Sequence, residues 1–335
     1  MPSDMKNANF PMDAEGHTYH VGLKRGEVCN RILTVGDPER ARRLASLLDQ
    51  DAPMFERESH RGFLTITGRF LGQPVSIIAI GMGMAMMDFM LREVRAVVDG
   101  PLCVIRIGTC GSIATAANVG DIIVPDGSAA VTRRFDAFFD LAAASSSPSA
   151  GELSADECYT FSRVFPADAE LTAALREQLG QQLSEERVVP GVNVTADTFY
   201  AAQGRVDPSF VDRNAKHVEQ IHEQYPDAVS LEMENFMLFH LARCATPLAP
   251  GVPSIRAAAA MIAVFQRQAN TSLPKAELAR LEMQAGRAVL DVLAHTLQDE
   301  ELHPESESVW LQQVAAASIA AATANTATTT TTSIG

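Results

Sequence analysis

Short apolar runs alternate with amphipathic, helix-like stretches along most of this chain. Strands that are separated by helices tend to pair in parallel, because the helical crossover returns the chain to the same end of the sheet. The alternation therefore predicts an α/β fold with a mostly parallel sheet. The strand-like runs are residues 31–35, 63–68, 75–80, 102–107, 121–124 and 187–194, and the helix-like stretches are residues 38–48, 86–98, 167–182, 233–244 and 275–297.

One of the strand-like runs leads into a sequence that is suited to holding an anion. Residues 102–105 are apolar, and Arg106-Ile107-Gly108-Thr109-Cys110-Gly111 follows directly. A guanidinium binds phosphate through paired hydrogen bonds, and a glycine-rich turn leaves backbone N–H groups free. With Gly36 and Arg40 from an earlier strand-to-helix turn, Arg106 and Thr109 form a phosphate-site hypothesis. Taken alone, an Arg at such a position is more often an ordinary surface residue.

A second stretch, far along the chain, is suited to a flat heterocycle. Phe199, Gln203 and Arg205 lie within seven residues of one another. The amide of Gln offers a donor and an acceptor that match an imide edge such as that of uracil. Arg can stabilise negative charge on a leaving base. An ordinary loop with an aromatic plug is the alternative for this stretch alone, so the pairing with the anion motif carries the interpretation.

Two carboxylates precede an apolar helix-like stretch. Glu232 and Glu234 are two residues apart, so on an extended segment they point the same way. Such a pair binds the vicinal hydroxyl groups of a sugar well. Acidic residues are also common at helix starts for electrostatic reasons alone.

Composition limits the classes of partner. The formal net charge is −14 over 335 residues, which argues against a nucleic-acid backbone or an anionic membrane as the main partner. The five cysteines are widely spaced and odd in number, which indicates reduced thiols rather than disulfides. No secretory signal or membrane-length apolar run is present, so we expect a cytoplasmic protein.

The expected domain organisation is simple. Residues 1–18 are polar and are expected to be a disordered leader, and residues 19–315 are expected to form a single domain. Residues 142–155 are rich in Ala, Ser, Pro and Gly, which is typical of a surface insertion. Residues 316–335 form an Ala- and Thr-rich low-complexity tail.

Together these stretches resemble the nucleoside phosphorylase-I superfamily, and within it the uridine phosphorylases. The similarity covers residues 20–297, and the motifs follow the family's order at similar spacings. It implies a three-layer α/β/α sandwich whose mixed central sheet forms a distorted barrel. The motifs that carry the resemblance are Val35-Gly36-Asp37-Pro38-Glu39-Arg40, Ser59-His60-Arg61, Arg106-Ile107-Gly108-Thr109-Cys110-Gly111, Val119-Gly120-Asp121, Asp197-Thr198-Phe199-Tyr200 with Gln203 and Arg205, and Glu232-Met233-Glu234.

The resemblance also implies roles for individual residues. Arg61 and His20 would come from a neighbouring subunit, so a homodimer is the smallest active unit, and a hexamer built from dimers is left open. No cofactor or metal ligand is implied, and phosphate is a co-substrate. Phosphate would be held by Gly36, Arg40, Arg61, Arg106 and Thr109, ribose by His20, Glu232, Met233 and Glu234, and the base by Phe199, Gln203 and Arg205, with Arg106, Gln203 and Arg205 as the catalytic residues.

One departure from the family pattern concerns an ion. Bacterial uridine phosphorylases place a Glu directly after the Arg of the Ser-His-Arg-like stretch, where it helps bind a monovalent cation at the dimer interface. Gly62 stands at that position here, so this ion is not expected. A different structural cation at the interface is left open.

The implied reaction is reversible phosphorolysis of uridine to uracil and ribose 1-phosphate, a pentosyl transfer of pyrimidine salvage. Deoxyuridine and thymidine are left open as further substrates. A purine nucleoside phosphorylase or a nucleosidase is the alternative. Purine-acting members usually carry a Ser-Asp pair where this chain has Ala263-Val264-Phe265-Gln266-Arg267, and a nucleosidase has little use for three phosphate-binding Arg. A nucleoside-binding protein without catalytic activity is the third hypothesis.

Overall fold

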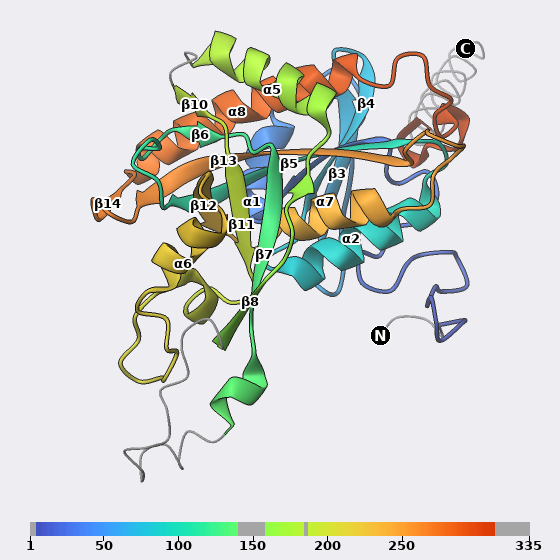
Figure 1. Ribbon diagram of the computed structural model, residues 1–335. Helices are drawn as coiled ribbons and strands as arrows, with labels where there is room; N and C mark the ends of the chain where they lie inside the picture. Colours follow the sequence, from blue (N-terminus) through green and yellow to red (C-terminus); the bar gives the residue numbers. More distant parts are fainter. Residues whose placement is uncertain (1–4, 140–157, 184–186, 312–335) are drawn as a thin grey trace, which may run out of the picture.

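A mixed sheet of 14 strands organises the residues that the computed structural model describes, which are residues 5–139, 158–183 and 187–311 (Figure 1). The strands are β1 (Arg31–Val35), β2 (Phe55–Glu58), β3 (Leu64–Phe70), β4 (Gln73–Ala79), β5 (Leu102–Ser112), β6 (Ile122–Ile123), β7 (Gly127–Arg133), β8 (Tyr159–Phe161), β9 (Phe165–Pro166), β10 (Val188–Val189), β11 (Val192–Ala196), β12 (Ala228–Glu232), β13 (Ile255–Gln266) and β14 (Thr271–Ser272).

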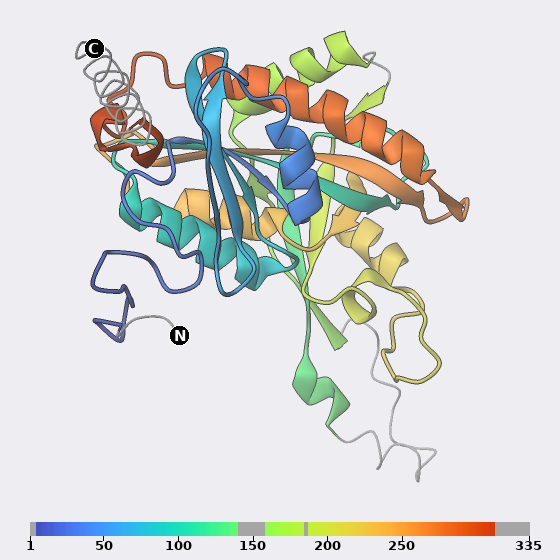
Figure 2. The ribbon, with the colours of Figure 1, turned by 180° about the vertical axis from the view of Figure 1, so that it is seen from behind.

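Helices cover both faces of this sheet. The α-helices are α1 (Pro38–Ala45), α2 (Met84–Val97), α5 (Ala169–Gln182), α6 (His217–Gln224), α7 (Asn235–Cys244) and α8 (Lys275–His295), and the short 3-10 helices are η1 (Phe135–Phe138), η3 (Ala201–Gln203) and η4 (Glu305–Glu307). Helices α1, α5 and α8 pack on one face, and α2 and α7 pack on the other (Figures 1 and 2). The predicted three-layer α/β/α arrangement is confirmed.

The middle of the sheet is parallel and buried on both faces. Strand β1 pairs in parallel with β4 and β5, and β5 pairs in parallel with β13 along its whole length. Every residue of β1 is buried, as expected for a parallel strand covered by helices on both sides. Strands β2 and β3 extend this sheet in antiparallel fashion, which makes it mixed.

At one end the sheet closes into a ring. Strand β5 pairs with β12, β12 with β11, β10 with β6, and β6 with β13, which returns to β5. Strands β10 and β11 are two parts of one chain segment, so the ring is continuous. The single strand predicted over residues 187–194 is interrupted at Gly191, where φ is +132° and a Cβ would press against Val229. The ring matches the predicted distorted barrel.

The structure differs from the sequence predictions in two further places. The segment after Arg106 is not a turn, because β5 continues through the glycine-rich motif to Ser112. The expected leader is partly ordered, since Lys6 bridges to Met12 and Met12 bridges to Thr18. The predicted insertion at residues 142–155 and the predicted tail at residues 316–335 lie outside the described residues, as do residues 1–4, and the extent of the single domain stays a prediction.

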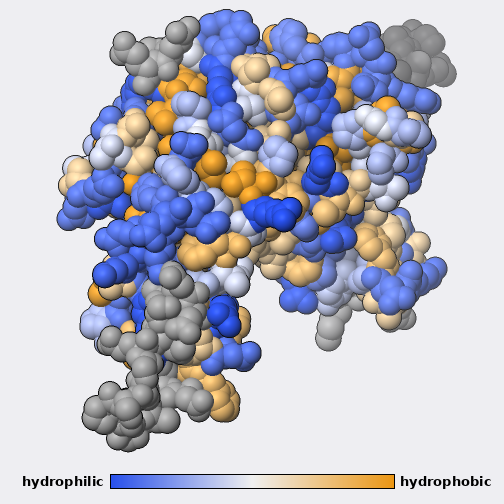
Figure 3. All heavy atoms as spheres, viewed as in Figure 1, coloured by the Kyte–Doolittle hydropathy of each residue, from blue (hydrophilic) through white to orange (hydrophobic). Residues whose placement is uncertain are grey.

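None of the described helices combines the length and apolar character that crossing a bilayer requires. The face drawn in Figure 3 interleaves hydrophilic and hydrophobic residues.

The segment that follows α8 docks against the start of the domain through Gly26. Gly26 has a φ of +82°, and a Cβ on this residue would overlap the carbonyl oxygen of Glu307. The amide of Val309 donates to the Gly26 carbonyl at 3.0 Å, and Trp310 beside it is buried.

Gly26→Ala should therefore lower the free energy of unfolding by about 2–5 kcal/mol, which combines the cost of a left-handed Ala with the cost of overpacking. Gly16→Ala is the matched control, because Gly16 has a similar φ of +88° but a Cβ there would meet no atom within 4 Å. Its cost should be only about 1–2 kcal/mol. Denaturant unfolding of both variants measures the difference, and equal losses would contradict the docking role of Gly26.

Candidate active site

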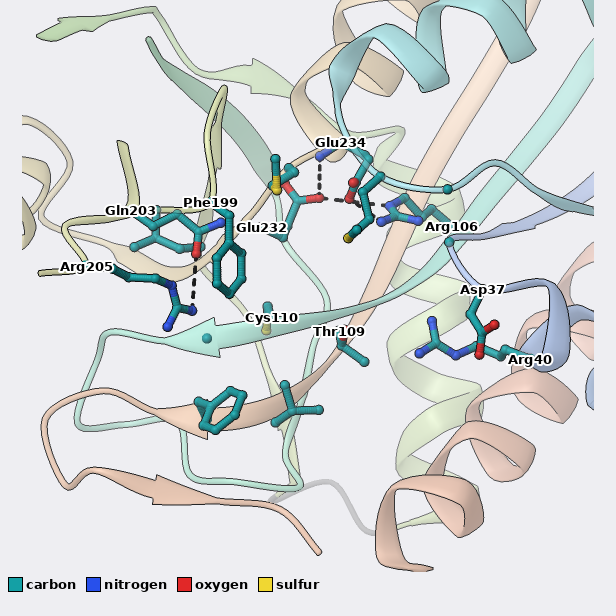
Figure 4. Close-up of a pocket in the computed structure, with 18 residues that line it drawn as sticks. Asp37, Arg40, Arg106, Thr109, Cys110, Phe199, Gln203, Arg205, Glu232 and Glu234 are labelled. Atoms are coloured by element: carbon teal, nitrogen blue, oxygen red, sulfur yellow. Dashed lines mark hydrogen bonds and ion pairs between the residues drawn. The ribbon is translucent and has the colours of Figure 1, made fainter. Parts of the chain in front are cut away.

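A cavity opens where strand β5 changes its partner. On one side, β1 pairs with β5 only as far as Ile107, and β12 joins that same side at Gly111 in the antiparallel sense. In the described sheet, the edge of β5 between these two residues faces no strand. Ligands of α/β proteins bind at such points, where neighbouring strands diverge. A cavity of about 440 Å³ lies there (Figure 4).

Most of the site residues that the sequence predicts line this cavity. The predicted residues that line it are Gly36, Arg40, Arg106, Thr109, Phe199, Gln203, Arg205, Glu232, Met233 and Glu234. The remaining lining residues are not among the predicted site residues; they are Asp37, Gly81, Met82, Cys110, Gly111, Leu231, Val264 and Phe265. The apolar members of this second group have no signal in the sequence, because buried strand residues look the same whether or not a cavity adjoins them.

Arg106 is the central cation of the site. It projects from β5, is only 4 % exposed, and donates from Nη2 to the Glu234 carboxylate (Figure 4). Its Nε lies 3.9 Å from the Glu232 carboxylate, and neither Nε nor Nη1 has a hydrogen-bond partner among the described residues. Buried donors without partners are costly, so they mark a place where a ligand supplies the acceptor.

Gly108 leaves space for this guanidinium. A Cβ on Gly108 would lie 3.3 Å from Nη2 of Arg106, which is tighter than ordinary van der Waals contact. The glycine of the motif is therefore explained by close packing inside a strand, and not by a turn.

Arg40 approaches the cavity from the first turn of α1. Asp37 caps this helix by accepting a hydrogen bond from the Glu39 amide at 3.0 Å. Arg40 is 8 % exposed, and its Nε donates to Glu282 of α8 at 2.7 Å. Arg40, Arg106 and Thr109 border the same end of the cavity (Figure 4). A helix start with two buried guanidinium groups nearby favours an anion.

Glu232 sits in a dense hydrogen-bond network beneath the cavity. Its Oε1 accepts from Asn193 at 2.7 Å and from the Thr195 hydroxyl, and its Oε2 accepts from the backbone amides of Glu234 and Asn235 at 2.7 and 3.0 Å. Burial, with repulsion from Glu234, raises the pKa of Glu232 to about 7. Arg106 acts in the opposite direction and limits this rise.

Glu234 is fixed from two sides. It accepts a hydrogen bond from the backbone amide of Gly83 at 2.6 Å and pairs with Arg106. Glu232 and Glu234 thus both face Arg106, as the spacing of the two carboxylates predicts. Met233 between them also lines the cavity.

Phe199, Gln203 and Arg205 form the other end of the cavity (Figure 4). The guanidinium carbon of Arg205 lies 4.0 Å from the centre of the Phe199 ring, and Arg205 donates to the Gln203 side-chain oxygen at 3.4 Å. Gln203 is buried, whereas Phe199 is 44 % exposed. Burial and the nearby Arg267 lower the pKa of Arg205. Arg267 also donates to the carbonyls of Gln203 and Gly204 at 2.6 and 2.8 Å, which holds this loop in place.

Arg61 and His20 do not reach the cavity of their own chain. Arg61 is exposed and donates to the Tyr19 hydroxyl at 3.1 Å. His20 pairs through Nδ1 with Glu93 at 2.6 Å and stacks on Phe89 with ring centres 3.9 Å apart. The single chain therefore leaves these two predicted site residues outside its own site, and their contribution to a neighbouring subunit stays a prediction.

Metal-binding geometry is absent from the described residues. Across residues 5–139, 158–183 and 187–311, no three His, Cys, Asp or Glu side chains gather in a way that would hold a metal ion. The expectation of a site without a metal cofactor stays a prediction.

Comparison with known proteins places this site in a family. A sequence profile described as the phosphorylase superfamily matches residues 30–294. The chain belongs to the phosphorylase superfamily. A uridine phosphorylase from Thermococcus kodakarensis is 29% identical over 91% of this chain and 96% of that protein. A solved structure from a study of two diverse uridine phosphorylases in the oomycete Phytophthora capsici is 39% identical, with a TM-score of 0.78 over 88% of this chain and 99% of that one.

Purine-acting relatives match a shorter segment. A DeoD-type purine nucleoside phosphorylase from Oceanobacillus iheyensis is 34% identical over 33% of this chain and 46% of that protein. The similarity to proteins named as uridine phosphorylases therefore covers much more of the chain.

The raised pKa of Glu232 predicts a pH-dependent stability. The folded protein holds a proton on Glu232 up to about pH 7, whereas the unfolded chain releases it near pH 4.5. Glu232 therefore makes its full contribution to the free energy of unfolding below about pH 4.5, and this contribution falls as the pH rises to about 7. Glu232→Gln removes this dependence, so its stability relative to the parent protein should rise by up to about 3 kcal/mol between pH 5 and pH 8.

Thermal melts of both proteins across this range measure the effect. Glu223→Gln, at an exposed position on α6, controls for the loss of one negative charge. A relative stability of Glu232→Gln that stays constant with pH would show that Glu232 is ionised throughout.

Proposed function

We propose that this chain catalyses the reversible phosphorolysis of uridine to uracil and ribose 1-phosphate. The observation that carries the proposal is the arrangement of one cavity, with unpartnered Arg106 donors at one end and the Gln203–Arg205 pair at the other. An anion and a base with an imide edge fit these two ends. The carboxylates of Glu232 and Glu234 stand between them, where a ribose would lie.

Each end of the cavity has a role in the reaction. Phosphate held by Arg40 and Arg106 is positioned to attack the anomeric carbon as the glycosidic bond lengthens. Its negative charge balances the oxocarbenium character of the ribose, and Arg106 is prevented from moving by its pairing with Glu234. Gln203 and Arg205 stabilise the negative charge that develops on the departing uracil. This route needs no covalent enzyme intermediate, since phosphate itself is the nucleophile.

The base-binding end favours a pyrimidine. Beyond Gln203 and Arg205, the lining of the cavity includes the apolar residues Leu231, Val264 and Phe265. Residues 263–267 contain no carboxylate to hold N7 of a purine. Relatives named as uridine phosphorylases also match nearly the whole chain, which supports the same choice.

The proposed active unit is a dimer with shared sites. Arg61 and His20 lie outside the cavity of their own chain. In the proposed dimer, each subunit contributes these two residues to the site of the other subunit. Phosphate and uridine are the proposed small-molecule partners. Five free cysteines support a reducing compartment such as the cytoplasm.

The test is a comparison of nucleosides in the presence of phosphate. Release of uracil from uridine and of hypoxanthine from inosine is followed with the same enzyme preparation. We expect uridine to be the better substrate by at least about 100-fold in kcat/KM, because a site built to hydrogen-bond one base edge leaves polar groups unpaired with another. A preference for inosine would overturn the proposal.

Arg205→Met should lower kcat for uridine by about 100- to 1,000-fold, because one donor to the leaving base is lost. The fold should persist, since the Arg205 side chain contacts Gln203 and Phe199, whereas the hydrogen bonds of Arg205 with Tyr200 and Asn214 use its backbone. Arg280→Met is the control, since the exposed Arg280 pairs with Glu277 and Gln284 of its own helix among the described residues. Steady-state kinetics measure the effect, and an unchanged kcat for Arg205→Met would contradict the assignment of the base-binding end.

Arg61→Met should inactivate the enzyme although the residue lies outside the cavity of its own chain. Co-refolding it with Arg205→Met should restore about a quarter of the parental activity, because half of randomly mixed dimers are hybrids and each hybrid has one complete site. Activity is measured before and after mixing. Two inactive variants that stay inactive together would argue against sites shared between subunits.

A further inference from the structure

A buried carboxylate outside the cavity joins α8 to the arginine at the start of α1. Glu282 is 2 % exposed, and both of its oxygens are occupied. Oε1 accepts from Nε of Arg40 at 2.7 Å, and Oε2 accepts from Nη2 of Arg43 at 2.6 Å. One carboxylate thus bridges two guanidinium groups that lie one helical turn apart.

The bridge acts on the orientation of Arg40. Of these three residues only Arg40 lines the cavity. The one side-chain hydrogen bond that Arg40 makes within the described residues uses Nε, which leaves both terminal nitrogens available to a ligand. Because the guanidinium is planar and rigid, fixing Nε also fixes the direction in which the terminal nitrogens point.

The bridge also preserves positive charge at the cavity. Glu282 alone would neutralise Arg40, and the buried pair would then attract an anion weakly. Arg43 shares the carboxylate from the other side, so the group of three carries a net charge of +1. Arg43 is 40 % exposed at its side chain and reaches this carboxylate from the surface.

The packing of the two helices holds the carboxylate in position. Gly286 lies one turn after Glu282 on α8, and a Cβ there would overlap the Leu44 side chain of α1. Leu44 is fully buried in the cluster that α1 and α8 share. The close approach at Gly286 fixes the distance between the helices, and Glu282 is carried on this fixed frame.

We propose that Glu282 is a positioning residue for the co-substrate, which aligns Arg40 for an oxyanion such as phosphate without touching the ligand itself. The identity of the anion rests on the proposed function. The alignment itself rests on the contacts of Glu282. Loss of Glu282 should weaken phosphate binding and leave the handling of the nucleoside largely unchanged.

The experiment uses Glu282→Gln, with Glu277→Gln on the exposed face of the same helix as the matched control. We expect the KM for phosphate to rise about 10- to 100-fold, the range that outer supporting contacts typically show. The KM for uridine and kcat at saturating phosphate should change less than about threefold. Calorimetry with inorganic phosphate measures the same loss without turnover. A merely structural role would change stability and all three kinetic constants together, and such a result would overturn the proposal.

A double-mutant cycle shows whether the effect passes through Arg40. Adding Glu282→Gln to Arg40→Met should cause no further loss of phosphate affinity, whereas additive losses would show that Glu282 acts elsewhere. If Glu282→Gln does not fold, Arg43→Met provides the second variant. It leaves Glu282 to neutralise Arg40 alone, and a smaller rise in the phosphate KM is expected. An unchanged phosphate KM would overturn the proposal.

The outcomes separate the two proposals. A parent protein that binds phosphate and releases uracil, with an unchanged phosphate KM in the variant, overturns the positioning role alone. A parent protein that neither binds phosphate nor turns over uridine overturns both.

Discussion

The site depends on one buried guanidinium. Arg106 is held by Glu234 and lies beside Glu232, and its Nε and Nη1 have no partner among the described residues. A buried cation with unused donors is stable only where carboxylates compensate its charge and a ligand completes its hydrogen bonds. Glu232 ends β12 and Glu234 follows it at the start of α7, so the ring of strands that brings β12 against β5 is also what assembles the site.

Guanidinium groups line one cavity of an acidic molecule. The chain carries a net charge of −14, and the cavity is lined by Arg40, Arg106 and Arg205 together with the carboxylates Asp37, Glu232 and Glu234. Burial strengthens each of these charges locally, because water no longer screens them. Glu282 holds Arg40 in place through a hydrogen bond, and Arg43 offsets the negative charge of the Glu282 carboxylate.

The sequence predicts the residues of the site better than their local structure. Arg, Gln and paired carboxylates have few other reasons to occur together in these motifs, and ten of the predicted residues line the cavity. The glycine-rich stretch predicts a turn, but β5 continues through it, and a Cβ on Gly108 would lie close to the Arg106 guanidinium. Composition alone does not distinguish a glycine needed for a turn from one needed for close packing.

Contacts between distant segments lie beyond sequence reasoning. Glu282 is 242 positions from Arg40, and on α8 it looks like any charged residue of an amphipathic helix. Arg267 likewise gives no sign in the sequence that it holds the carbonyls of Gln203 and Gly204. The roles of Arg61 and His20 come only from the family resemblance, and they depend on a second subunit.

In the proposed reaction, phosphate held by Arg106 and Arg40 is the nucleophile. Phosphorus NMR of a reaction containing uridine and inorganic phosphate tests it most directly, because ribose 1-phosphate is a phosphate monoester with its own resonance. The account predicts that this resonance appears in step with uracil, one for one, and that no uracil forms without phosphate. Uracil release accompanied by free ribose, with inorganic phosphate unchanged, would contradict it.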